Sequence, residues 1–138
     1  MAATALAEKG RNVPISFNRK EAKDHGEGGV IIGAPLAGRV LIVDDVISAG
    51  TSVRESADLI RAAQALPCGV VIALDRMERG QGALSAVQEV QQDLQLPVVS
   101  ISTLDDLIGY LGGRGEMARE LQRVMRYRLQ YGAPEHAR

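Results

Sequence analysis

The segment 39–56, RVLIVDDVISAGTSVRES, constrains the fold more than any other part of this chain. It begins with a short continuous apolar run at residues 40–43, which is typical of a strand covered on both faces in a parallel sheet. Asp44 and Asp45 follow at the carboxyl end of this predicted strand. In open α/β sheets that edge is where ligands bind, so we expect an α/β fold with a mainly parallel sheet and a site at this acidic pair.

Small residues come directly after the strand and precede a predicted helix. They allow several backbone N–H groups to turn toward one point, two hydroxyl groups add donors, and the helix contributes its partial positive end. Ser52 and Glu55 have the spacing of a capping box, which predicts that the helix begins at Ser52. The pattern therefore predicts a phosphate site formed by Ser48, Ala49, Gly50, Thr51 and Ser52.

The two carboxylates need a partner other than the phosphate, because anions repel. Vicinal ribose hydroxyls or a hard cation such as Mg²⁺ would suit them. An ordinary strand-to-helix turn, capped by Asp44 or Asp45, is the alternative. Sugar hydroxyls beside a phosphate describe a phosphoribosyl group, and the run resembles the phosphoribosyl pyrophosphate motif of type I phosphoribosyltransferases.

A charged segment at residues 19–29, RKEAKDHGEGG, precedes this motif. Taken alone, a run of mixed charge is most often a solvated hairpin tip. Its three glycines favour a second interpretation, in which a mobile loop closes over a polyphosphate, neutralises a departing pyrophosphate and excludes water. The cationic or titratable groups of this predicted loop are Arg19, Lys20, Lys23 and His25.

Three stretches together resemble the orotate phosphoribosyltransferase family: FNRKEAKDHGEGG, ALDRMERGQGALSAVQEV and VVSISTLDDLIGYL. The resemblance implies one phosphoribosyltransferase domain over residues 1–138, folded as a three-layer α/β/α sandwich. It also implies a catalytic loop at 18–30 that reaches over the active site of the partner subunit of a homodimer. The implied substrates are phosphoribosyl pyrophosphate and orotate, with Mg²⁺ held through the bound pyrophosphate and ribose rather than directly by the protein. The implied reaction is transfer of ribose 5-phosphate to orotate in pyrimidine synthesis.

The resemblance also assigns roles to single residues. Lys23 and His25 match the loop residues that contact pyrophosphate, and Asp44 and Asp45 match the ribose-binding pair. We therefore expect Lys23, His25 and Asp45 to be catalytic. The remaining expected substrate-binding residues are Arg19, Lys20, Val46, Ile47, Ser48, Ala49, Gly50, Thr51, Ser52 and Arg76, the last matching the arginine that holds the orotate ring.

Arg76 can also be interpreted from its position in the sequence alone. It follows a predicted strand that ends at Asp75, so a guanidinium there is placed to fork onto a planar anionic base. Without the resemblance, a surface salt bridge with Asp75 or Glu78 is the favoured interpretation.

The resemblance begins in the interior of the family's sequence, so we expect an N-terminally incomplete domain. In the family a further strand lies between those predicted at 13–17 and 39–44, and its loss would leave unpaired ladder groups on both neighbours. A non-catalytic phosphoribosyl-binding module, or an inactive fragment of the enzyme, is therefore the alternative to an active enzyme.

Two other classes fit less well. The VLIVDD run also resembles the first strand of a receiver domain, but such a domain needs neither a phosphate loop nor the upstream charged segment. A net charge of −1 without a basic stripe argues against nucleic acid as the main partner. The single cysteine, Cys68, and the absence of a long apolar stretch predict a cytoplasmic location.

Periodicity predicts an alternating order of elements. We expect helices at 2–9, 52–65, around 84–94, 104–111 and 116–130, and strands at 13–17, 39–44, 69–75 and 97–102, with a hairpin return near 30–32. Val53, Ala57 and Ile60 are predicted to face the core, as are Met117, Leu121 and Val124. The tail from residue 132 onward is predicted to be frayed.

Overall fold

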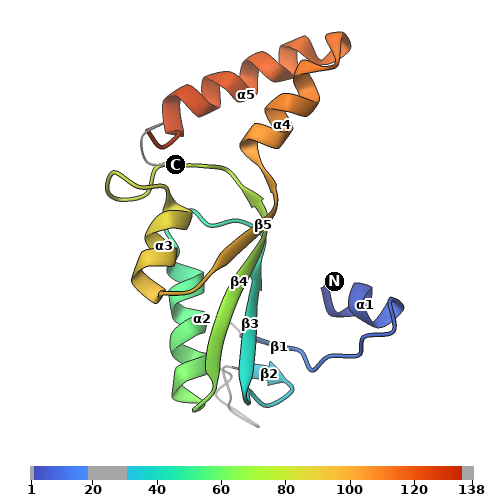
Figure 1. The fold of residues 1–138 in the computed structure, drawn as a ribbon, viewed down its shortest axis with the longest axis vertical. Coiled ribbons are helices and arrows are strands. Elements are labelled where there is room, and N and C mark those ends of the chain that lie inside the picture. Colours follow the sequence, from blue (N-terminus) through green and yellow to red (C-terminus); the bar gives the residue numbers. More distant parts are fainter. Residues whose placement is uncertain (1, 19–30, 135–138) are drawn as a thin grey trace, which may run out of the picture.

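The computed structural model describes residues 2–18 and 31–134, in which strands alternate with helices (Figure 1). Three parallel strands form the main sheet in the order β3-β4-β5. Their bounds are Arg39–Asp44 for β3, Leu66–Asp75 for β4 and Val98–Thr103 for β5. The predicted α/β class with a parallel sheet is confirmed, and β4 begins at Leu66 rather than at residue 69 because the Leu66 N–H donates to the Gly38 carbonyl.

Two helices cover one face of this sheet, as Figure 1 shows. Helix α2 (Thr51–Ala62) connects β3 to β4, and α3 (Ala86–Leu94) lies between β4 and β5 in the sequence. Their apolar stripes are buried against the strands, because apolar residues three or four apart lie on the same face of a helix. The core formed there contains Ile42, Ile47, Val53, Ala57, Ile60, Val70, Ile72, Ala86, Val87 and Val90, which confirms the predicted inward stripe of α2.

The opposite face of the sheet is bare in the described part of the chain. Leu41 and Val43 are 52% and 55% exposed, and Ile101 on β5 is 80% exposed. The prediction that residues 40–43 are covered on both faces is therefore wrong for the described residues. Successive side chains of a strand point to opposite faces, so the apolar run places Ile42 in the core and its two neighbours on the uncovered side.

A separate hairpin precedes the main sheet. β1 (Ser16–Asn18) pairs antiparallel with β2 (Ile31–Gly33), which confirms the predicted return near residues 30–32, although the first strand begins three positions later than residue 13. No described residue of β1 pairs with β3, so the two sheets remain distinct, as expected if a strand belongs between them. Helix α1 (Ala2–Glu8), close to the predicted 2–9, lies apart from the main sheet (Figure 1).

The last helices extend beyond the carboxyl end of the sheet (Figure 1). Helix α4 (Leu104–Gly112) begins with a capping box between Thr103 and Asp106, and its Leu104 and Leu111 are buried. The short 3-10 helix η1 (Gly115–Met117) leads into α5 (Ala118–Tyr131), which contains no buried residue. The prediction that residues 117, 121 and 124 belong to the core is therefore wrong, because they lie half-exposed along an arm that packs mainly against α4.

The chain beyond α5 is held more firmly than the sequence suggests. Gly132 forms an antiparallel bridge with Glu78, and Ala133 is buried and donates its N–H to the Met77 carbonyl. The predicted fraying is thus wrong for residues 132 and 133, and residues 135–138 lie outside the described part.

Candidate functional site

The acidic pair lies at the carboxyl edge of the main sheet. Asp44 ends β3, and Asp45 is the first residue beyond it. The Asp45 carbonyl accepts hydrogen bonds from the N–H groups of Ala73 and Leu74, at 3.0 and 3.1 Å. Because β4 ends at Asp75, these bonds hold the loop that leaves β3 against the end of the neighbouring strand.

The two carboxylates have different surroundings. Asp44 is half-buried, and its Oδ1 accepts from the Asp45 N–H at 2.9 Å while its Oδ2 accepts from the Ser52 hydroxyl at 2.8 Å. Asp45 is exposed, and its Oδ1 accepts from the Val46 N–H at 2.7 Å. No described residue donates a hydrogen bond to the other oxygen of Asp45.

The loop between β3 and α2 is held by two buried residues. The Ile47 side chain lies in the core, at 4% exposed. Gly50 is buried and has φ 73°, the left-handed region, and a Cβ added there would lie 2.4 Å from Cγ2 of Val90. Only glycine therefore allows the chain to pass this point and enter the helix.

Helix α2 begins differently from the predicted capping box. Its first residue is Thr51, Gly50 is the cap, and no side chain accepts a hydrogen bond from its first turn. Ser52 instead donates to Asp44. The predicted Ser52–Glu55 box is therefore wrong, and the first N–H groups of the helix, with its partial positive end, are left to an anion.

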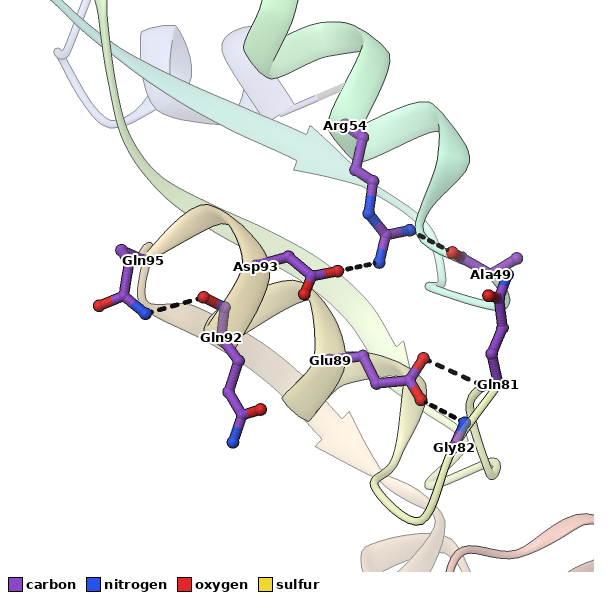
Figure 2. Close-up of polar contacts among 8 residues, drawn as sticks. All are labelled: Ala49, Arg54, Gln81, Gly82, Glu89, Gln92, Asp93 and Gln95. Carbon is purple, nitrogen blue, oxygen red and sulfur yellow. Dashed lines mark hydrogen bonds and ion pairs between the residues drawn. The ribbon is translucent and has the colours of Figure 1, made fainter.

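Arg54, which the sequence patterns did not single out, contacts this loop from inside α2. Figure 2 shows its guanidinium between the Ala49 carbonyl, at 2.5 Å from Nη1, and the Asp93 carboxylate of α3, at 2.6 Å from Nη2. Asp93 lies 39 positions away in the sequence, a separation at which no local spacing signal exists.

Arg76 lies at the same edge, just after β4. Its Nη2 contacts the Ser48 hydroxyl at 2.5 Å and the Glu78 carboxylate at 3.0 Å. Its Nε is buried, and no described residue accepts a hydrogen bond from it. The salt bridge to Glu78, one of the two alternatives that the sequence offered, is thus present.

A network of backbone bonds fixes the turn that carries Arg76 and Glu78. Met77 has φ 53° and donates its N–H to the Asp75 carboxylate at 2.8 Å. The Arg79 N–H donates to the Tyr131 carbonyl at 2.8 Å. The loop that follows is also held, since both oxygens of Glu89 accept backbone N–H groups, at 3.0 Å from Gln81 and 2.7 Å from Gly82 (Figure 2).

The structure therefore brings the two predicted halves of the site together. The acidic pair, the loop and Arg76 converge on one edge of the sheet, with Ser48 touching Arg76. The predicted loop residues Arg19, Lys20, Lys23 and His25 lie outside the described residues. Among the residues described, no three acidic, histidine or cysteine side chains gather as a metal site, and no helix has the length and apolar character to cross a membrane.

No family model matches the chain. The orotate phosphoribosyltransferase of Chromobacterium violaceum is 68% identical over 134 residues, which is 97% of this chain and 63% of that protein. The Laribacter hongkongensis orotate phosphoribosyltransferase is 69% identical over 130 residues, covering 94% of this chain and 61% of that protein.

A solved structure agrees. The crystal structure of the Francisella tularensis orotate phosphoribosyltransferase matches with a TM-score of 0.73 at 30% identity, over 95% of this chain and 60% of that one. The chain thus spans about three-fifths of the length of these relatives. Sequence identity and fold together show that the chain is similar to orotate phosphoribosyltransferases over about three-fifths of their length.

Proposed function

We propose that the protein containing this chain is an orotate phosphoribosyltransferase, which transfers ribose 5-phosphate from phosphoribosyl pyrophosphate to orotate and releases pyrophosphate. One observation carries the proposal: an acidic pair, a phosphate-type loop and Arg76 converge on one sheet edge of a chain that is 68% identical to part of such an enzyme. Each group suits one part of the two substrates.

The loop suits the 5′-phosphate. Its residues lead into the uncapped first turn of α2, whose free N–H groups and partial positive charge favour an anion. Ile47 and Gly50 fix the backbone, so the donors are arranged before the ligand arrives. The proposed phosphate-binding residues are Val46, Ile47, Ser48, Ala49, Gly50, Thr51 and Ser52.

The acidic pair suits the ribose hydroxyls, which donate hydrogen bonds to carboxylates. Asp44 is immobilised by Ser52, whereas Asp45 keeps one carboxylate oxygen available. Two carboxylates near the sugar also offset positive charge that develops on the ribose ring as pyrophosphate leaves. We therefore propose that Asp45 is a catalytic residue and that Asp44 is a ribose-binding residue.

Arg76 suits orotate, a planar anion. Its Nη2 is fixed by Ser48 and Glu78, and the buried Nε–H remains as a donor in a defined direction. A planar guanidinium recognises a planar carboxylate-bearing ring better than an ammonium does, because its donors lie in one plane.

The proposal also includes the charged segment 19–29, a magnesium ion and a location in the cell. Arg19, Lys20, Lys23 and His25 would close over the pyrophosphate, with Lys23 and His25 acting on the leaving group at the partner subunit's site in a homodimer. Mg²⁺ would be held through oxygens of the bound pyrophosphate and ribose rather than directly by the protein, and would neutralise the pyrophosphate. The proposed location is the cytoplasm, in keeping with the single cysteine.

Calorimetric titration of the 138-residue chain with phosphoribosyl pyrophosphate and Mg²⁺ tests the site, and an orotate consumption assay on the same sample tests turnover. Saturable binding that Asp45→Asn weakens supports the proposal. Binding with no turnover is also the result expected of the second candidate, a non-catalytic phosphoribosyl-binding module. No binding would overturn the assignment of this edge as the phosphoribosyl site.

A further inference from the structure

The Ala49–Gly50 peptide occupies the centre of the proposed phosphate loop, and one side chain fixes its orientation. Arg54 donates from Nη1 to the Ala49 carbonyl at 2.5 Å and from Nη2 to Asp93 at 2.6 Å (Figure 2). The Arg54 side chain is 32% exposed and that of Asp93 55%, so the pair lies at the boundary between α2, α3 and solvent. Arg54 thus connects the loop to the last turn of α3.

The direction of this carbonyl determines where the next N–H points. In a trans peptide the C=O and the following N–H point in opposite directions, and the described residues contain no cis peptide bond. Because Arg54 holds the Ala49 carbonyl on its own side, the Gly50 N–H points away from Arg54. No described residue accepts a hydrogen bond from that N–H.

We propose that Arg54 and Asp93 form a positioning pair that presents the Gly50 N–H to the 5′-phosphate. This inference rests on the proposed function, because it assigns a role at the same site. Neither residue is a catalytic one. Arg54 acts through the peptide plane, and Asp93 keeps the guanidinium in the orientation in which it spans both acceptors.

The residue types fit this role. A guanidinium has several donors in a rigid plane, so it bonds two acceptors on different elements at once, which an ammonium on a flexible stem does less well. Gly50 contributes the other half of the arrangement, since any Cβ at that position would lie 2.7 Å from Nη1 of Arg54. The loop and the guanidinium therefore fit together only as they stand.

A competing account is that Arg54 simply adds positive charge near the phosphate. The two accounts predict opposite signs for one variant. Asp93→Ala removes a negative charge, so a purely electrostatic role predicts tighter phosphate binding. A positioning role predicts weaker binding, because Arg54 is released from Asp93 and no longer fixes the peptide.

The test is a nuclear magnetic resonance titration of the 138-residue chain with ribose 5-phosphate, following the Gly50 amide. Arg54→Lys keeps the charge but loses the fork, and it is expected to weaken binding about tenfold, the value of one hydrogen bond to a charged group. Asp93→Ala is expected to weaken binding in the same direction and to reduce the shift of the Gly50 amide on binding. The matched control is Arg61→Gln, which breaks an exposed 3.4 Å pair with Asp58 on the same helix and is expected to leave the affinity unchanged.

The outcomes distinguish failure of the positioning role from failure of the phosphate site. Wild-type affinity in Arg54→Lys, or tighter binding by Asp93→Ala, would overturn the positioning role while the phosphate site stands. Equal weakening in the Arg61→Gln control would also overturn it, since the effect would then belong to the helix as a whole. If the unaltered chain shows no saturable shift, the phosphate site itself fails and this role with it.

Discussion

The Ser52 hydroxyl donates to Oδ2 of Asp44 at 2.8 Å, so a serine at the start of a helix serves the acidic pair rather than the helix. Ser85, at the start of α3, behaves in the opposite way. Its hydroxyl accepts from the Gln88 N–H, and the Gln88 side chain accepts from the Ser85 N–H, which completes a capping box. Two serines in similar sequence positions therefore have different physical roles.

This difference predicts opposite consequences for two equivalent substitutions. Ser85→Ala removes a helix cap and is expected to lower the free energy of unfolding by about 1 kcal/mol. Ser52→Ala is expected to change that free energy by less than about 0.5 kcal/mol, but to weaken ribose 5-phosphate binding because Asp44 loses its partner. Urea unfolding and a ligand titration of both variants check this, and a larger stability loss for Ser52→Ala would contradict it.

Gly50→Ala is expected to lose both stability and phosphate binding. The position has φ 73°, and the new Cβ would lie 2.4 Å from Cγ2 of Val90, a fully buried residue. Strain of this kind costs about 1–3 kcal/mol. Urea unfolding measures the loss.

The matched control is Gly109→Ala. This glycine lies inside α4 with nothing within 4 Å of an added Cβ, so the substitution is expected to stabilise the chain by roughly 0.5–1 kcal/mol. Equal effects of the two substitutions would show that the close approach to Val90 does not matter.

The hydrogen bonds that Asp106 accepts from Thr103 predict how the stability of the fold depends on pH. A hydrogen bond from the Thr103 hydroxyl, and a second from the Thr103 N–H, hold the pKa of the Asp106 carboxyl below its ordinary value. Because the folded-state pKa is lower than the unfolded one, this carboxylate stabilises the fold above about pH 4, and its contribution is lost as the pH falls through the folded-state pKa.

The measurement is the urea midpoint between neutral and acidic pH for the wild type, Asp106→Asn and Thr103→Val. Both variants are expected to show a smaller fall in midpoint on acidification than the wild type does. Identical pH curves for wild type and Asp106→Asn would rule out this carboxylate as a source of acid sensitivity.

Much of this architecture follows from local patterns. The apolar run of β3 and the stripe Val53, Ala57 and Ile60 depend on side-chain period, so they were predictable from the sequence. The convergence of Asp44 and Arg76 was predictable as well, because adjacent parallel strands end at one edge.

Other features were not predictable because they depend on which elements pack together. The Arg54–Asp93 pair joins α2 to α3, and Ser52 donates to Asp44, eight positions earlier in the sequence, instead of capping its helix. The apolar run at residues 40–43 predicted cover on both faces, but in the described residues no element packs over Leu41 and Val43.

Asp45→Asn and Lys23→Ala are each expected to lower turnover at least about tenfold in a full-length protein that contains this sequence. The first removes a charge beside the ribose, and the second removes a cation proposed to act on departing pyrophosphate. Steady-state rates with phosphoribosyl pyrophosphate and orotate check both. Wild-type rates in both variants would overturn the residue assignment.

A substitution at Glu78 is expected to affect orotate and phosphoribosyl pyrophosphate differently. Its carboxylate lies 3.0 Å from Nη2 of Arg76, and its side chain is only 17% exposed. In Glu78→Gln the guanidinium loses its charged partner and its fixed direction, so the KM for orotate is expected to rise about tenfold while the KM for phosphoribosyl pyrophosphate stays unchanged. Glu116→Gln, the same change at a 69% exposed position with a 3.9 Å contact to Arg114, is the control and is expected to alter neither constant. A parallel rise in both constants would mean that Glu78 supports the turn as a whole and does not orient Arg76 toward the base.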